Sequence, residues 1–250
     1  MTQSVPGSQS SAPPSPPGRV TRTLLRWLMH TANVAAVETL SPHFRLVDLE
    51  GEALRNMEWT VGQKIQVSMG SGLSARTYTP ISWDADNGRT RLLTFAHGDG
   101  PGSRWANGLR QGDTCQFFGP RRSLDLSALE SPAVLFGDET SFGLAAALRE
   151  SARSNDAIHL FEVSDAAESR SVLEAVGLRR AKLIERLPDD IHLAAADVEM
   201  SNLAASAAHF VLTGKASSIQ RVRRTLKTAG VASSRMHTKP YWAQGKAGLD

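Results

Sequence analysis

Four consecutive residues, Arg76-Thr77-Tyr78-Thr79, combine a guanidinium group, an aromatic ring and hydroxyls. In a β-strand, Arg76 and Tyr78 would project from one face and Thr79 from the other, because strand side chains alternate. A ring offers a stacking surface, a fixed cation suits a phosphate, and a hydroxyl suits the polar edge of a heterocycle. The stretch therefore favours a planar cofactor that carries a phosphate tail.

A glycine-rich cluster follows from His97 to Trp105, with the sequence HGDGPGSRW. Glycines such as Gly98 and Gly102 allow backbone N–H groups to approach a pyrophosphate, and Ser103 is predicted to open a short helix as its N-cap. Together the two clusters predict a flavin dinucleotide site. Each alone has a plainer interpretation, an amphipathic barrel strand for the first and a turn with a helix cap for the second.

Composition narrows the class of protein. The chain has 250 residues, 41% of them hydrophobic and 21% charged, which is ordinary for a globular protein of one large or two average domains. Its formal net charge is only +3, and its basic residues lack the interleaved aromatic residues of a nucleic-acid surface. We therefore predict no nucleic-acid partner.

A single cysteine, Cys115, excludes an internal disulfide and any multi-cysteine iron–sulfur or zinc site. Its apolar neighbours predict a buried core thiol. No apolar run is long enough to cross a bilayer, and the N-terminus does not resemble a signal peptide, so we predict no membrane insertion. These features favour the cytoplasm.

The first half of the chain reads as short strands. Residues 1–18 are rich in Ser, Pro, Gly and Gln and predict a disordered tail, and apolar residues at helical spacing predict a short helix over 21–30. Asn87-Gly88 between two alternating runs predicts a hairpin. With one helix near 103–109, the β-prone runs predict a six-stranded antiparallel barrel in a domain over 19–124. The six runs cover residues 34–39, 44–49, 64–69, 76–83, 91–96 and 114–118.

The second half alternates apolar strands with helices, which predicts a parallel α/β domain over 131–250, connected to the barrel through a hinge near 124–131. Its first strand ends at Phe136, so Gly137-Asp138-Glu139-Thr140 lies where open α/β sheets bind ligands. Asp138 and Thr140 are therefore candidate site residues. The dinucleotide fingerprint G-x-G-x-x-G is absent from the sequence.

Several of these motifs, in this order, resemble the siderophore-interacting proteins, the FAD-dependent ferric-siderophore reductases within the ferredoxin–NADP reductase-like superfamily. R-x-Y-T alone marks the superfamily. The combination of H-G-x-G-P-x-S-x-W, G-D-E-T and a C-terminal Y-W-x-x-G is much more specific. The matching segments begin at residues 39, 76, 97, 119, 137 and 241.

The resemblance implies FAD, NADPH or NADH as cofactors and a ferric siderophore as the partner, with a ferredoxin or another electron-transfer protein as a further partner. It implies hydride transfer from the nicotinamide to the flavin and then single electrons to Fe(III), with no catalytic side chain. Residues around the flavin–nicotinamide region would include Glu139, and Tyr241 would lie near the domain interface. The cofactor-binding residues it implies are Arg76, Tyr78, Thr79, Pro80, His97, Gly98, Gly102, Ser103, Asp138, Thr140 and Trp242.

The chain departs from the family pattern at two positions. Ile81 stands where R-x-Y-T-x-R has its second arginine, and Lys215 stands where the late A-G-E motif has glutamate. Two alternatives stay open: a general flavin reductase or electron-transfer module, and a non-enzymatic FAD-containing siderophore-binding protein. The reversed charge at Lys215 favours the non-enzymatic alternative. Residues 188–206 carry no chemistry that we can assign. The basic residues between Arg221 and Lys227 are either a solvated helix face or a contact for an anionic ligand.

Overall fold

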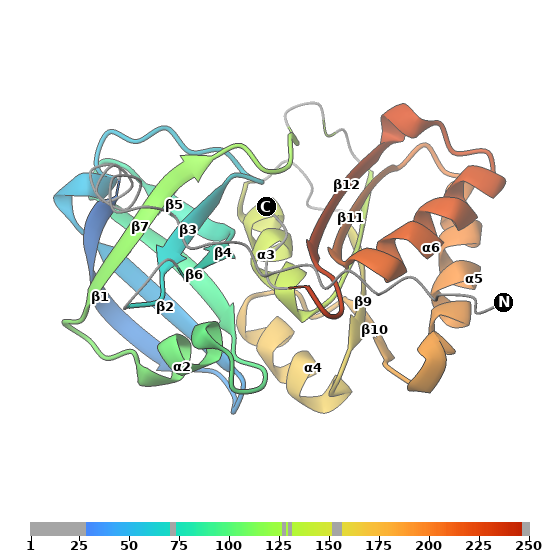
Figure 1. Ribbon diagram of the computed structural model, residues 1–250. Helices are drawn as coiled ribbons and strands as arrows, with labels where there is room; N and C mark the ends of the chain where they lie inside the picture. The colour runs from blue at the N-terminus through green and yellow to red at the C-terminus, as the bar shows by residue number, and fades with distance from the viewer. Residues whose placement is uncertain (1–28, 71–73, 127–128, 130–131, 152–156, 247–250) are drawn as a thin grey trace, which may run out of the picture.

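The computed structural model describes residues 29–70, 74–126, 129, 132–151 and 157–246, which form two domains side by side (Figure 1). The tail predicted over 1–18 and most of the helix predicted over 21–30 lie outside the described residues. His30, the last residue of that predicted helix, instead begins a strand. The burial pattern gives the reason, because Ala32 and Val34 are buried and Thr31 and Asn33 are exposed, which is the alternation of a strand.

Seven antiparallel strands among the described residues form the N-terminal sheet, which curls into a barrel (Figure 1). Their order is β4-β3-β7-β1-β2-β6-β5. Alternate residues such as Val47, Ile65 and Phe117 fill the interior, where each fully buried side chain of this size contributes roughly 1.5–3 kcal/mol. The strands are β1 (His30–Thr39), β2 (Phe44–Glu50), β3 (Lys64–Ser68), β4 (Ala75–Tyr78), β5 (Pro80–Asp84), β6 (Arg89–Phe95) and β7 (Thr114–Arg121).

The predicted fold class is confirmed, with one strand more than the sequence indicated in the barrel. The run over 76–83 divides into β4 and β5 at Thr79, and these two strands lie at opposite ends of the sheet order. Pro80 follows the break and lacks the N–H that a continuous ladder would need. The predicted hairpin is confirmed, since Asn87-Gly88 joins the antiparallel strands β5 and β6.

One helix, α2 (Pro101–Gly108), lies between β6 and β7, near its predicted place. Its N-cap is Gly100, so the prediction that Ser103 opens the helix is wrong. Pro101 has a fixed backbone angle that suits the first helical position, and the helix therefore starts earlier. Ser103 lies inside the first turn, where its hydroxyl donates to the carbonyl oxygen of His97 at 2.7 Å.

The C-terminal domain is a parallel sheet in the order β10-β9-β8-β11-β12, covered by helices on both faces (Figure 1). Helices α3 and α4 cover the face of the sheet that is turned toward the barrel, and α5 and α6 cover the opposite face. Both faces of β8 are buried, which accounts for its continuous apolar sequence. The strands are β8 (Ala133–Gly137), β9 (Ile158–Val163), β10 (Lys182–Glu185), β11 (His209–Lys215) and β12 (Met236–Trp242). The helices are α3 (Phe142–Glu150), α4 (Ala166–Ala175), α5 (Leu193–Ala204) and α6 (Ala216–Thr228). Short 3-10 turns are η1 (Glu52–Leu54), η2 (Glu139–Ser141), η3 (Pro188–Asp190) and η4 (Ser233–Arg235).

A shared apolar core joins the two domains. The ring of Phe142, at the start of α3, stacks on Phe44 of the barrel at 5.5 Å and packs edge-on against Phe161 at 4.8 Å. A Cβ atom at Gly143 would lie 3.2 Å from the carbonyl oxygen of Thr79, so glycine lets α3 approach the β4–β5 junction closely. Ile81, one of the two departures from the family pattern, is buried in the same cluster. The packing fixes the barrel against the α/β domain at this junction.

Candidate functional site

The barrel side of the site is built on β4 and the first turn of α2. A Cβ atom at Gly102 would lie 3.1 Å from Cγ of Arg76, so the glycine lets the arginine stem lie against the helix turn. The guanidinium donates to the carbonyl of Ala75 at 2.8 Å. Among the described residues, no carboxylate lies within ion-pair distance of Arg76. A cation held beside a helix N-terminus fits a phosphate group.

Tyr78 lies two residues along the same strand. Its ring is 5.5 Å from that of Trp105 on α2, tilted by 35°. Burial raises the pKa of Tyr78 well above its ordinary value, so the phenol stays neutral at physiological pH. The pair provides a fixed aromatic surface next to Arg76. These residues therefore fit a cofactor with a planar ring and a phosphate chain.

The loop before α2 lies farther along the domain junction. His97 and Gly98 are exposed, and Gly98 has a positive φ of 63° with nothing within 4 Å of the position of a Cβ atom. Both residues line a cavity of about 150 Å³ whose opposite wall includes Glu139 and Glu168 of the α/β domain. The loop is thus open toward the second domain, while Ser103 holds its backbone from the helix side.

Thr79 and Tyr241 connect the two halves. Thr79 lies between β4 and β5, and its side chain lies close enough to the hydroxyl of Tyr241 on β12 to lower the pKa of that phenol. Burial has the larger effect and raises the pKa of Tyr241 to about 12. Pro80 is buried directly after Thr79. The junction therefore places the aromatic C-terminal strand against the residues of the R-x-Y-T motif.

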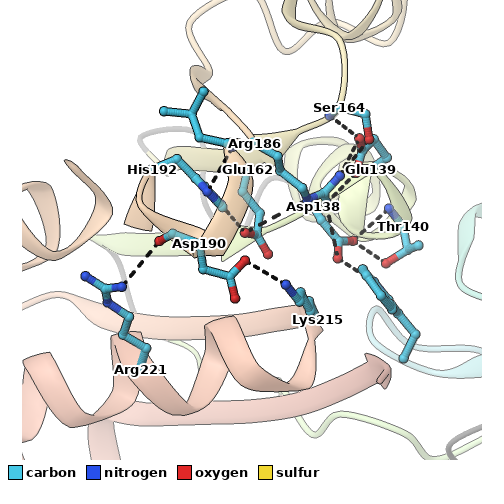
Figure 2. A network of polar contacts seen from close by, with 12 residues as sticks. Asp138, Glu139, Thr140, Glu162, Ser164, Arg186, Asp190, His192, Lys215 and Arg221 are labelled. Atoms are coloured by element: carbon cyan, nitrogen blue, oxygen red, sulfur yellow. Dashed lines mark hydrogen bonds and ion pairs between the residues drawn. The ribbon is translucent and has the colours of Figure 1, made fainter. Parts of the chain in front are cut away.

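Asp138 lies at the centre of the α/β side, fully buried at the carboxyl end of β8 (Figure 2). Its Oδ1 accepts from the backbone N–H of Thr140 at 2.9 Å and also from the Thr140 hydroxyl, and its Oδ2 accepts from Nε1 of Trp242 at 2.7 Å. Burial raises the pKa of Asp138 to about 6, although the bonds from Thr140 and Trp242 lower it. The carboxylate thus fixes the indole of Trp242 at the sheet edge.

The close packing around this carboxylate requires glycine on the neighbouring strand. Gly214 on β11 has a φ of 100°, and a Cβ atom there would lie 2.5 Å from Oδ2 of Asp138. The strand order reverses between β8 and β11, since β9 and β10 lie on one side of β8 and β11 and β12 lie on the other. Such a reversal, at the carboxyl ends of the strands, is where open α/β sheets bind nucleotides.

A buried ion-pair network continues from Asp138 along the same edge (Figure 2). Arg186, directly after β10, donates to both carboxylate oxygens of Glu139 at 2.9 and 2.7 Å, and the backbone N–H of Ser164 donates to Glu139 at 2.6 Å. Buried carboxylates need such partners because an unpaired buried charge is costly. Glu139 is therefore held within the protein, and it does not project freely toward the barrel.

His192 and Glu162 form the next part of this network. The backbone N–H of Leu187 donates to Nδ1 of His192 at 3.2 Å, so in the neutral ring the proton is on Nε2 and is donated to Glu162 at 2.8 Å. Both side chains are almost fully buried. Sequence reasoning missed Arg186, Glu162 and His192. The one available signal was Glu162 between the apolar residues Phe161 and Val163 of β9, because a buried carboxylate needs a partner.

Lys215, the second departure from the family pattern, ends β11. Its Nζ donates to Oδ1 of Asp190 at 2.8 Å, and Arg221 donates to the backbone carbonyl of Asp190 at 3.3 Å (Figure 2). Arg221 also donates to Asp197 at 2.8 Å. Residues 188–206 thus do carry polar contacts at the sheet edge. Arg221 is engaged within the protein, whereas Arg223, Arg224 and Lys227 are exposed, as a solvated helix face would be.

Fold and site together define a two-domain protein with a candidate cofactor site where the domains meet. The barrel residues bring a cation and an aromatic surface to a junction with the carboxyl edge of a parallel sheet. Among the described residues, no helix is long and apolar enough to cross a membrane.

Two family models match this chain, one over each domain. Residues 131–245 match the family model described as siderophore-interacting protein, and residues 66–124 match the siderophore-interacting FAD-binding domain. These ranges together cover more than half of the chain, which therefore belongs to the siderophore-interacting family. FAD is the cofactor of its N-terminal domain, and the family and fold support flavin-dependent electron transfer.

Solved structures share the fold. The siderophore-interacting protein SipS from Aeromonas hydrophila matches with a TM-score of 0.69 and 21% identity, covering 88% of this chain and 93% of its own. A siderophore utilization protein from T. fusca gives 0.68 and 22% identity over 89% and 95%. A ferredoxin NADP+ reductase from Neisseria gonorrhoeae, solved with FAD and NADP, gives 0.65 and 14% identity over 85% and 98%. No curated protein matches this chain.

Proposed function

We propose that this protein is an FAD-dependent reductase that passes electrons from NADPH or NADH to Fe(III)-siderophores and releases Fe(II) in the cytoplasm. The observation that carries the proposal is the junction at Thr79 and Tyr241. There the Arg76–Tyr78 surface of the barrel meets the edge of the α/β domain that holds Asp138 and Trp242.

On the barrel side, Arg76 and the first turn of α2 bind the phosphates of FAD, with Gly102 and Ser103 shaping that turn. Tyr78, supported by Trp105, orients the ring system, and Thr79 with Pro80 fixes the position of the strand ends. His97 and Gly98 present their backbone to the same cofactor. When bound, FAD supplies a two-electron acceptor that can release electrons one at a time. Arg76 has no carboxylate partner among the described residues, and its close approach to Gly102 also supports this assignment.

On the α/β side, the nicotinamide nucleotide binds at the strand reversal between β8 and β11. Asp138 acts through its bonds to Thr140 and Trp242, so it is a positioning residue, and the indole that it orients lines the junction. The apolar core that the two domains share excludes water from the packed part of the junction, so it helps to keep water away from the reacting rings.

The iron chemistry needs no nucleophile or general base from the protein. Siderophore oxygens are hard donors, and they hold the more highly charged Fe(III) more tightly than Fe(II). Transfer of a single electron therefore weakens the complex, and the protein only has to bring the ferric siderophore near the cofactor.

The decisive experiment begins with an absorption spectrum of the FAD-loaded protein, followed by anaerobic addition of NADPH or NADH. We expect a band near the usual ~450 nm for a flavin that bleaches with at least one nucleotide. A ferric siderophore is then added with a chromogenic Fe(II) chelator. Rapid chelate colour supports the proposal. Reduction of free flavin with no Fe(II) release would instead identify a general flavin reductase.

A second candidate function differs only in the electron donor. The ion pairs of Arg186 with Glu139 and of Lys215 with Asp190 occupy the sheet edge where a nucleotide would bind. This observation favours a protein whose FAD is reduced by a ferredoxin. Bleaching by reduced ferredoxin, with none by either nucleotide, would support this second function.

A further inference from the structure

The Lys215–Asp190 ion pair lies beside the start of a helix. Lys215 ends β11 and is the N-cap of α6, where no side chain caps the first turn. The first N–H groups of α6 and the ammonium group of Lys215 therefore create a positively charged position at the sheet edge. The Asp190 carboxylate accepts a hydrogen bond from this ammonium group, with Nζ and Oδ1 2.8 Å apart.

The segment that carries Asp190 is strained. Asp189 and Asp190 have positive φ angles of 56° and 54° in the turn η3, a conformation that is unfavourable for residues other than glycine. Lys215 binds the side chain and Arg221 binds the backbone carbonyl. The hydrogen bond from Lys215 also holds the pKa of Asp190 below its ordinary range, so the carboxylate is ionised. Lys215 and Arg221 thus anchor this turn to α6.

The surroundings indicate which anion that is. Lys215 pairs with Trp242 in the register of β11 and β12, and Trp242 bonds with Asp138 across the strand reversal. The position is thus continuous with the crevice where a nucleotide is expected. In addition, the hydroxyl of Ser218 in the first turn of α6 is fully buried and has no hydrogen-bond partner within the described residues.

We propose that Lys215 and the N-terminus of α6 form a subsite for a phosphate group of the pyridine nucleotide, and that Asp190 occupies this subsite until the nucleotide displaces it. Because a nicotinamide nucleotide is the electron donor in the function proposed above, the subsite rests on that function. The nucleotide phosphate then competes with the Asp190 carboxylate for the same subsite. Lys215, which stands where the family motif has glutamate, increases the affinity of this subsite for phosphate.

The test measures nucleotide binding directly, by calorimetric titration of the FAD-loaded full chain with NADP+, NAD+, ADP and 2′,5′-ADP. Asp190→Asn removes the competing charge and retains a side chain that tolerates positive φ. We expect it to tighten binding of the phosphate-bearing probes roughly tenfold, the effect of one lost or gained charged contact. Lys215→Gln should weaken binding by a similar factor, and the double variant should resemble Lys215→Gln.

Lys182→Gln is the matched control, because Lys182 pairs with Glu199 at 2.6 Å at the other end of its strand, away from the carboxyl edge. It should leave every affinity unchanged. A larger effect on 2′,5′-ADP than on ADP would identify the 2′-phosphate as the occupant, and an equal effect would identify the phosphates at the 5′ position. Unfolding midpoints of all variants show whether each is folded.

Two results overturn the subsite. One is unchanged affinity in Asp190→Asn and Lys215→Gln. The other is the absence of nucleotide binding in Asp190→Asn. If Asp190→Asn binds nucleotide more tightly but no variant transfers electrons to FAD, the subsite stands and the proposed reductase function fails.

Discussion

At the scale of single residues, Arg76 is the group on which the cofactor assignment depends most directly. Arg76→Ala should weaken FAD binding by roughly 1.5–3 kcal/mol, the range for a lost charge-assisted hydrogen bond. The measurement is a fluorescence titration of the apoprotein with FAD. Arg89→Ala is the control, because Arg89 pairs with Glu50 on the barrel surface. Equal FAD affinity in both variants would mean that Arg76 does not contact the phosphates.

Asp138 gives a second residue-scale prediction, on pH dependence. Its pKa is about 6 in the folded protein and 3.8 in the unfolded chain, so the native state binds the proton more tightly. The stability due to this group is therefore greatest below pH 3.8 and falls as pH rises to about 6. The loss is on the order of 3 kcal/mol.

Urea unfolding of the wild type and of Asp138→Asn, from pH 4 to pH 7, isolates this effect. The variant should gain stability relative to the wild type as pH rises, because the asparagine side chain does not ionise. A constant difference across this range would show that Asp138 has an ordinary pKa.

At the scale of elements, the conformation of the C-terminal end of β11 depends on Gly214. Gly214→Ala combines an unfavourable positive φ with a Cβ atom 2.5 Å from the Asp138 carboxylate. Gly230→Ala is a matched control, since Gly230 has a φ of 85° but nothing within 4 Å of a Cβ atom. We expect roughly 1 kcal/mol of destabilisation in the control and clearly more, about 2–4 kcal/mol, in Gly214→Ala. Equal unfolding free energies would show that the carboxylate moves aside without cost.

Elements are also the scale at which the sequence predicts most. Alternating or continuous apolar runs indicate the strands, because a half-buried and a doubly buried strand leave different patterns. Helix starts are less visible, and the first turn of α2 shows why. Gly100 caps it without a side-chain signal, whereas Ser103 has the right residue type but lies inside the turn. The break at Thr79 had only Pro80 as its marker.

The site itself is only partly visible in the sequence. Motif residues such as Arg76 and Asp138 are found because they lie close together in the chain. The partners of Glu139 and Glu162 are not visible in this way. Arg186, directly after β10, and His192, at the start of α5, lie 47 and 30 residues away from them in the chain. Such contacts depend on strand order, which local patterns do not specify.

At the scale of the whole molecule, the domains share one core, so they should unfold together. Cys115 reports on the barrel, because it is buried and burial raises its pKa to about 12, which makes the thiol unreactive until the barrel opens. Helical circular dichroism reports mainly on the α/β domain, which holds α3 to α6. In the wild type, thiol labelling and the helical signal should change at the same urea concentration.

Phe142→Ala tests whether that shared core is the cause. The ring is fully buried and contacts Phe44 of the barrel and Phe161 of the sheet, so its removal should cost about 3–5 kcal/mol. Because the lost contacts join the domains, the two signals should also separate into distinct transitions. Leu226→Ala is the control, since Leu226 is equally buried but lies in the core under α5 and α6. It should destabilise the α/β domain, and this destabilisation should reach the barrel through the intact junction. Separate transitions already present in the wild type would show that the interface at Phe142 contributes little to holding the flavin domain against the nucleotide domain.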